Sequence, residues 1–177
     1  RALAAAGLEK RVWAAPDGNL TFWEGGEGPS LVFLHGAGDQ AGAFATVVRP
    51  LMDSYRILIP DLPGHGASEP ASGPLTMAGM TAGAEAFLLE HTDESTILIG
   101  NSMGGMISLM QAATNPGTVE GLVLVNPAVP PVGLLGATPG AVVRLILPTA
   151  PLVGPAFLEA YLRRRPVEEY VADTFEF

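Results

Sequence analysis

Cysteine is absent from the 177 residues, and histidine occurs only three times. Without cysteine the chain can form neither a disulfide nor a thiolate nucleophile, a composition that fits a cytoplasmic protein. The histidines, His35, His65 and His91, are scattered along the chain and lack the paired spacing of metal ligands. The sequence therefore predicts no metal site and no organic cofactor.

Charge is also scarce, at 15% of the residues, and basic charge is the scarcer sign. Lysine and arginine number 9 against 18 acidic residues, and the net charge of −9 argues against nucleic acid as a partner. Several prolines interrupt the most apolar stretch, residues 121–158, so we predict no transmembrane segment. The first residues lack the long apolar run of a secretory signal. No pattern in the sequence defines an oligomeric state.

The sequence does contain a regular alternation of short apolar runs and helical patterns. A hairpin is expected first, with the turn Pro16-Asp17-Gly18 at its tip. Further along the chain, His91 is expected to form the C-terminal cap of a helix. The predicted strands are residues 10–15, 19–24, 31–34, 56–60, 96–100 and 122–125, and the predicted helices are residues 39–51, 76–91 and 103–113. The alternation predicts an α/β fold with a mostly parallel, doubly wound sheet that is covered on both faces.

The strand signals stop after residue 128. Residues 129–177 are apolar and rich in proline, and their patterns predict short helices. We therefore divide the chain into an α/β unit, residues 1–128, and a smaller helical unit, residues 129–177.

The most informative motif is Gly100-Asn101-Ser102-Met103-Gly104, which lies between a predicted strand and a predicted helix. In this context Gly-x-Ser-x-Gly forms a sharp turn that projects the serine from the carboxyl end of the sheet. Ser102 is thus the candidate nucleophile, and the N–H of Met103 at the helix start would face a developing oxyanion. One alternative is that Ser102 is an ordinary helix N-cap. A nucleotide-binding loop at residues 36–41 is disfavoured, because Ala41 stands where that loop needs glycine.

Three blocks, in this order, resemble the α/β-hydrolase family: His35-Gly36-Ala37-Gly38, residues 61–68, and residues 100–105. The resemblance covers residues 31–126 and implies a serine hydrolase of the α/β-hydrolase fold. It implies that the N–H of Ala37 is the second oxyanion donor, beside Met103. The residues that would shape the loops around Ser102 are His35, Gly36, Gly38, Gly100, Asn101 and Gly104.

The resemblance extends to two further features. Asp61 and His65 would hydrogen-bond backbone groups in the turn after the fourth strand. Residues 129–177 resemble the start of the lid, or cap, that many members of the family insert at this point, and their apolar character suits a roof over the site. The alternative is that these residues simply pack onto the sheet.

The pattern breaks after the nucleophile. A serine needs a base, and the family places an acid and then a histidine after the serine. No histidine follows Ser102, and Asp173 is the single aspartate that does, as a weak candidate for the acid. A sheet that ended at residues 122–125 would also leave an apolar strand at its edge. We therefore expect the 177 residues to be a truncated part of an α/β hydrolase.

These observations predict a serine hydrolase that cleaves a small to medium apolar carboxylic ester through an acyl-enzyme. One alternative is a carbon–carbon bond hydrolase of the same fold, because residues 101–105 are similar to the elbow of such enzymes. The other is a non-catalytic protein that binds a small apolar molecule. The chain as printed would be inactive if the histidine and the acid are truly missing.

Overall fold

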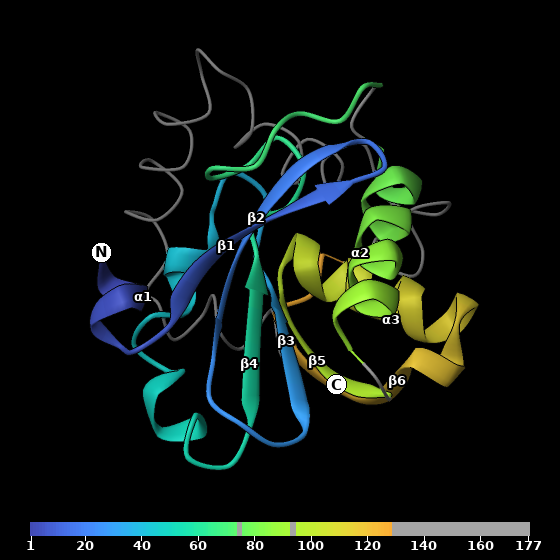
Figure 1. Ribbon diagram of the computed structural model, residues 1–177. Coiled ribbons are helices and arrows are strands. Elements are labelled where there is room, and N and C mark those ends of the chain that lie inside the picture. Colours follow the sequence, from blue (N-terminus) through green and yellow to red (C-terminus); the bar gives the residue numbers. More distant parts are fainter. Residues whose placement is uncertain (74–75, 93–94, 129–177) are drawn as a thin grey trace, which may run out of the picture. The chain divides into compact units, whose positions relative to one another are not determined.

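The computed structural model describes residues 1–73, 76–92 and 95–128, which belong to one compact unit, Arg1–Val129 (Figure 1). Residues 129–177, the predicted lid, lie outside the described residues. The described part is built around a six-stranded sheet with the order β1-β2-β4-β3-β5-β6. Its strands are β1 (Glu9–Ala15), β2 (Gly18–Gly25), β3 (Ser30–Leu34), β4 (Arg56–Pro60), β5 (Thr96–Asn101) and β6 (Val119–Val125).

The sheet is mixed. β1 and β2 form the predicted antiparallel hairpin, with Ala15 paired to Gly18 at its tip, and β2 also runs antiparallel to β4. The pairs β3–β4, β3–β5 and β5–β6 are parallel, as the alternation of strands and helices predicts. In register, Leu34 lies opposite Gly100, and Gly100 lies opposite Leu124. The parallel strands β3, β5 and β6 therefore end at one edge of the sheet, where α/β proteins bind their ligands.

Apolar residues cover both faces of this sheet. Alternate residues of β3 point to opposite sides: Val32 and Leu34 belong to one core cluster, and Leu31 and Phe33 to the other. The first cluster takes in the buried face of the helix α2 (Met77–His91), which lies beside the helix α3 (Met103–Thr114) (Figure 1). The second cluster takes in the short N-terminal helix α1 (Ala2–Ala5). The doubly covered α/β sheet is confirmed.

The predicted helix over residues 76–91 begins as its capping residue requires. The Oγ1 of Thr76 accepts a hydrogen bond from the N–H of Gly79 at 3.1 Å, so one free amide of the first turn of α2 has a partner. The third predicted helix corresponds to α3, which is followed by the 3-10 helix η3 (Pro116–Thr118).

The single helix predicted for residues 39–51 is wrong. Two short 3-10 helices lie there, η1 (Ala41–Phe44) and η2 (Arg49–Leu51). Pro50 explains the break, because a proline inside a helix lacks the N–H that the helix needs and clashes with the preceding turn. Phe44 and Val48 are nevertheless buried, so their spacing reflects two contacts with the same core cluster rather than one continuous helix.

Candidate active site

Ser102 lies in the sharp turn between β5 and α3, in a backbone conformation that few residues other than glycine adopt. Its φ is +51° and its ψ is −112°. It stands at the N-cap position of α3, but its side chain makes no capping hydrogen bond. A capping serine has an extended backbone and bonds an amide of the first turn, so the geometry disfavours the ordinary N-cap interpretation. A non-glycine residue held in such a conformation is a feature of functional sites.

Close backbone contacts explain the glycines around Ser102. A methyl group on Gly104 would overlap the carbonyl group of Leu34, so the first turn of α3 can approach β3 only without a side chain here. A methyl group on Gly100 would lie 2.5 Å from the carbonyl oxygen of Gly104 and from the Cα of Gly105. Both contacts are shorter than atoms tolerate. These glycines therefore allow the turn to be tight enough to project Ser102.

The loop after β3 meets this turn directly. Gly36 is buried, and a methyl group on it would lie 3.4 Å from the Cβ of Ser102 and 3.6 Å from the side-chain amide nitrogen of Asn101. The next residues, Ala37 and Gly38, are exposed, and Gly38 has a φ of +73°, which explains the glycine at this position. The structure thus brings the first and third sequence blocks together at Ser102.

The two amides predicted to bind an oxyanion have no acceptor in the described part of the chain. There, neither the N–H of Ala37 nor the N–H of Met103 donates a hydrogen bond to a backbone or side-chain acceptor. The amide of Met103 belongs to the first turn of α3, whose N–H groups have no partner within the helix. Within the described residues, neither amide is thus committed to another acceptor.

His35 is fully buried beneath this loop, and both of its ring nitrogens contact backbone groups. The N–H of Leu62 donates to Nε2 at 3.0 Å, so Nε2 carries no proton. Nδ1 therefore holds the proton and donates it to the carbonyl oxygen of Gly36 at 2.8 Å. Burial lowers the pKa of His35 below its ordinary value, which keeps the ring neutral. Neither ring nitrogen remains available to accept a proton from a serine.

The second sequence block connects the neighbouring loops through Asp61. This buried carboxylate accepts hydrogen bonds from the N–H of Ala41 at 2.7 Å and from the N–H of Ala67 at 2.9 Å. His65 lies beside His35, with ring centroids 5.2 Å apart, and its Nδ1 is 3.0 Å from the carbonyl oxygen of Pro63. The block joins the turn after β4 to the first residue of η1.

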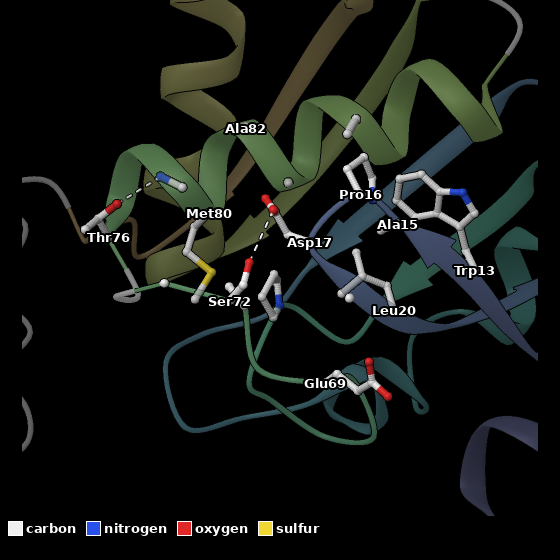
Figure 2. A pocket seen from close by; sticks show the side chains of 17 residues that line it. Trp13, Ala15, Pro16, Asp17, Leu20, Glu69, Ser72, Thr76, Met80 and Ala82 are labelled. Carbon is white, nitrogen blue, oxygen red and sulfur yellow. Dashed lines mark hydrogen bonds between the residues drawn. The ribbon is translucent and has the colours of Figure 1, made fainter.

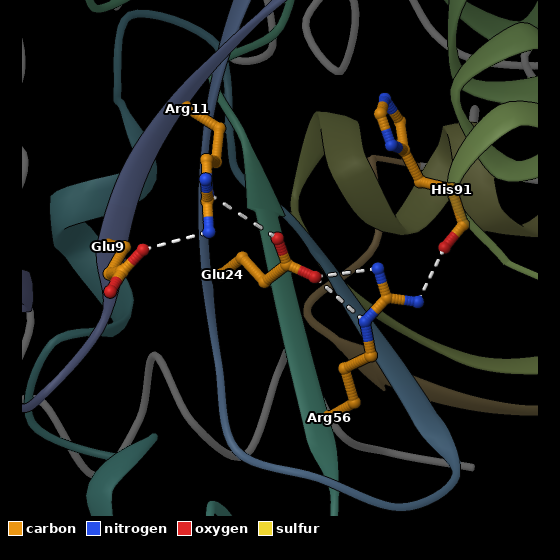
Figure 3. Close-up of polar contacts among 5 residues, drawn as sticks. All are labelled: Glu9, Arg11, Glu24, Arg56 and His91. Carbon is orange, nitrogen blue, oxygen red and sulfur yellow. Dashed lines mark hydrogen bonds and ion pairs between the residues drawn. The ribbon is translucent and has the colours of Figure 1, made fainter.

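His91 does not cap α2 with its side chain, contrary to the prediction. Its ring packs against the rings of Trp13, Phe22 and Phe87, with centroids 4.5–5.2 Å apart. Arg56 takes the capping role instead: its guanidinium donates to the carbonyl oxygen of His91 at 2.8 Å and pairs with Glu24 at 2.6 Å (Figure 3). The sequence could not indicate this, because the two partners lie on strands far from the helix.

A cavity of about 530 Å³ lies between the hairpin tip, the loop before α2 and the first half of α2 (Figure 2). Trp13, Leu20 and Met80 give it an apolar lining, and Asp17 and Glu69 add two carboxylates. Neither Ser102 nor the two candidate oxyanion donors are among the described residues that line it. We therefore do not place the acyl-transfer chemistry in this cavity.

Sequence reasoning missed the segment that follows β6. Asn126 has a φ of +43°, and the N–H of Ala128 donates to the carbonyl oxygen of Ser102 at 2.9 Å. An asparagine directly after a strand was the available signal, since asparagine adopts this conformation more readily than most residues. The remaining candidate, Asp173, lies outside the described residues.

Two further observations concern residues 1–73, 76–92 and 95–128 alone. No three His, Cys, Asp or Glu side chains there are grouped closely enough to hold a metal ion. No helix in the same ranges has the length and apolar character required to cross a membrane.

The family model of the alpha/beta hydrolase fold matches residues 29–161, which is most of the chain. The chain belongs to the α/β-hydrolase fold family. The strand order, the turn at Ser102 and the adjoining loop at Gly36 are this family's arrangement in the described residues.

Curated relatives of this member of the α/β-hydrolase fold family include an esterase and an acetyltransferase component. A pimeloyl-[acyl-carrier protein] methyl ester esterase of Xanthomonas oryzae pv. oryzae is 38% identical over 100 residues, which are 56% of this chain and 37% of the esterase. A dihydrolipoyllysine-residue acetyltransferase component of the acetoin cleaving system of Cupriavidus necator is 34% identical over 104 residues, 59% of this chain and 28% of the relative. The matched part thus spans about a third of these proteins.

A solved structure agrees with this family assignment. A bacterial membrane phospholipase A superposes with a TM-score of 0.70 at 30% sequence identity, and the match covers 74% of this chain and 44% of that structure. The chain is therefore similar to proteins that are longer than the matched region.

Proposed function

We propose that Ser102 is the nucleophile of a hydrolase that cleaves a small to medium apolar carboxylic ester. The observation that carries the proposal is the conformation of Ser102. Ser102 lies between β5 and α3 with a φ of +51°, and its side chain does not cap the helix. The Gly36 loop lies against it. An ordinary helix start requires neither this conformation nor this close loop, whereas a nucleophile elbow requires both.

The proposed reaction is acyl transfer in two steps. The Oγ of Ser102 attacks the carbonyl carbon of the ester, and its proton passes to a base. The carbonyl oxygen becomes an oxyanion, which accepts hydrogen bonds from the N–H groups of Ala37 and Met103. The alcohol leaves with a proton from the protonated base, and an acyl-enzyme remains on Ser102. Water activated by the same base then attacks this ester and releases the carboxylic acid.

The base is the part of this proposal that the printed sequence does not supply. The family's chain order places the histidine after the serine, and no histidine follows Ser102; of the three that precede it, His35 also uses both ring nitrogens for backbone contacts. We place the catalytic histidine and its acid outside the 177 residues. The intact mass of the protein from its source checks this: a mass above that of the printed sequence agrees with it, and an equal mass contradicts it.

The preference for an ester is supported by the relatives' names. The matched esterase acts on a methyl ester, and the similar structure is a phospholipase. Another relative is named as an acetyltransferase component. Family resemblance alone therefore does not distinguish hydrolysis, in which water takes the acyl group, from transfer of the acyl group to another acceptor.

Covalent labelling tests the nucleophile. We expect a fluorophosphonate probe to label the full-length protein at Ser102. The labelling rate should fall at least about a hundredfold in Ser102→Ala and should be unchanged in Ser72→Ala. Ser72 is a suitable control because it is an exposed serine on the loop before α2. A folded parent protein that does not label contradicts the proposal and favours a non-catalytic binding protein. Hydrolysis of a chromogenic apolar ester, compared with a vinylogous diketone, then separates the ester hydrolase from the carbon–carbon bond hydrolase.

A further inference from the structure

Two non-glycine residues with positive φ occur among the described residues, and hydrogen bonds join their neighbourhoods. They are Ser102, at +51°, and Asn126, at +43°. The N–H of Ser102 donates to the carbonyl oxygen of Val125 at 2.9 Å, and the N–H of Ala128 donates to the carbonyl oxygen of Ser102 at 2.9 Å. Both backbone groups of Ser102 are thus bonded to the four-residue turn Val125–Ala128, here called the β6 turn.

The β6 turn also packs against the start of α3. A methyl group on Gly105 would lie 2.8 Å from the Cβ of Pro127 and 3.0 Å from its Cα, so the proline ring occupies the space that a side chain at residue 105 would need. Proline fixes its own φ and has no N–H to satisfy. Pro127 is therefore a stiff surface against the first turn of α3.

These contacts oppose the natural tendency of Ser102 to relax. A left-handed backbone brings the Cβ of an L residue too close to its carbonyl oxygen, so the conformation persists only where the surroundings impose it. Within its own helix, the carbonyl oxygen of Ser102 accepts one longer bond, from the N–H of Met106 at 3.2 Å. The β6 turn supplies the other contacts, and Asn126 directs them, because its positive φ reverses the chain and points the N–H of Ala128 towards Ser102.

We propose that the β6 turn is a positioning element for the nucleophile, with Asn126 as the residue that sets its geometry. The inference rests on the proposed function insofar as Ser102 is the nucleophile. The turn acts on the backbone of Ser102 and needs no contact with substrate. Its effect is to hold the Oγ of Ser102 in the orientation in which it can attack.

The matched variants Asn126→Val, Asn126→Gly and Asn115→Val test this in the full-length protein. Valine is strained at positive φ, and glycine is not. Asn115 follows α3 at a φ of −134°, so Asn115→Val makes the same chemical change at a negative φ and serves as the control. Two quantities are measured for each: the hydrogen-exchange rates of the Ser102 and Ala128 amides, and the rate of fluorophosphonate labelling.

We expect Asn126→Val to raise both exchange rates roughly five- to thirtyfold and to slow labelling to a similar degree. Asn126→Gly should keep the exchange protection, and Asn115→Val should change neither quantity. If Asn126→Val does not fold, Asn126→Ala imposes a milder form of the same strain. It should then raise the exchange rates and slow labelling, by smaller factors.

Equal exchange in the two valine variants overturns the proposed restraint. Faster exchange with an unchanged labelling rate overturns its role in positioning the nucleophile. A parent protein whose two amides are protected but whose serine does not label contradicts the proposed function, and the exchange data then support the restraint by themselves.

Discussion

Two regions of the sheet are held together by different means. In the elbow region, residues 100–105 with the Gly36 loop and the β6 turn, the contacts are backbone hydrogen bonds and close approaches of glycines. In the hairpin region, β1 and β2 with Arg56 and His91, ion pairs (Figure 3) and packed aromatic rings add to the backbone pairing of the two strands. In the elbow region the close backbone approaches leave no room for larger side chains. In the hairpin region the stability of the contacts depends on the charges and rings of the side chains.

This difference predicts how each region tolerates substitution. At Gly100 and Gly104 an added methyl group has nowhere to go, because the obstructing atoms are backbone atoms of α3 and β3. In the hairpin region the Arg56 and Glu24 side chains are about 30% and 26% exposed, so their removal changes charge and hydrogen bonding more than packing. Three sets of variants would break or sharpen the comparison.

Gly104→Ala should have the largest effect. The new methyl group would overlap the carbonyl group of Leu34, so either α3 or β3 must move. We expect the free energy of unfolding to fall by at least about 3 kcal/mol, measured by chemical denaturation. The control is Gly117→Ala, where no atom lies within 4 Å of the added methyl group and the change should stay within about 0.5 kcal/mol. Similar losses in the two variants would contradict the steric explanation.

Arg56→Met should have an intermediate effect. The variant keeps the apolar stem but removes the donors to Glu24 and to the carbonyl oxygen of His91 at the end of α2. The expected loss is about 1–3 kcal/mol of unfolding free energy, because a half-buried carboxylate loses its closest partner. Arg11→Met removes a more exposed guanidinium, with 54% of its side chain accessible, and should cost only about 0–1 kcal/mol. If Arg11→Met costs as much, a general loss of positive charge explains both.

His91→Phe should have the smallest effect, visible in the pH dependence of stability. Burial lowers the pKa of His91 in the folded protein below its ordinary value of 6.5. Between these two pKa values the unfolded chain binds more protons, so the free energy of unfolding falls as the pH drops below 6.5. Phenylalanine keeps the aromatic packing and cannot be protonated.

The measurement is chemical denaturation between about pH 8 and pH 5. We expect parent and His91→Phe to differ little at the alkaline end and the variant to lose less stability at the acidic end. Part of the acid loss should remain, because burial also lowers the pKa of His35. An identical acid loss in both proteins would show that the ring of His91 does not contribute.

Much of the fold could be predicted from local patterns. The hairpin tip at Asp17, the capping residue Thr76 and the buried strands are signalled by residues that lie next to one another. The predicted helix over residues 39–51 failed because apolar spacing reports which side chains are buried, whereas Pro50 determines whether the helix continues.

The candidate site divides in the same way. Ser102 and its glycines are recognisable because a tight turn needs small residues close together in the sequence. The contacts of Arg56 with the end of α2, and of Ala128 with Ser102, join elements that are remote in the sequence. No local pattern specifies such contacts, since they arise only when the sheet has assembled.

The β6 turn has a consequence for the order in which the protein is synthesised. Ser102 leaves the ribosome before Ala128, whose amide completes its set of backbone hydrogen bonds. A nascent chain that ends between these residues carries the whole Gly-x-Ser-x-Gly motif but lacks the strand and the turn that hold its serine. The proposed nucleophile can therefore gain these contacts only after β6 has joined the sheet, and a stalled or cleaved chain that lacks β6 contains the motif without them.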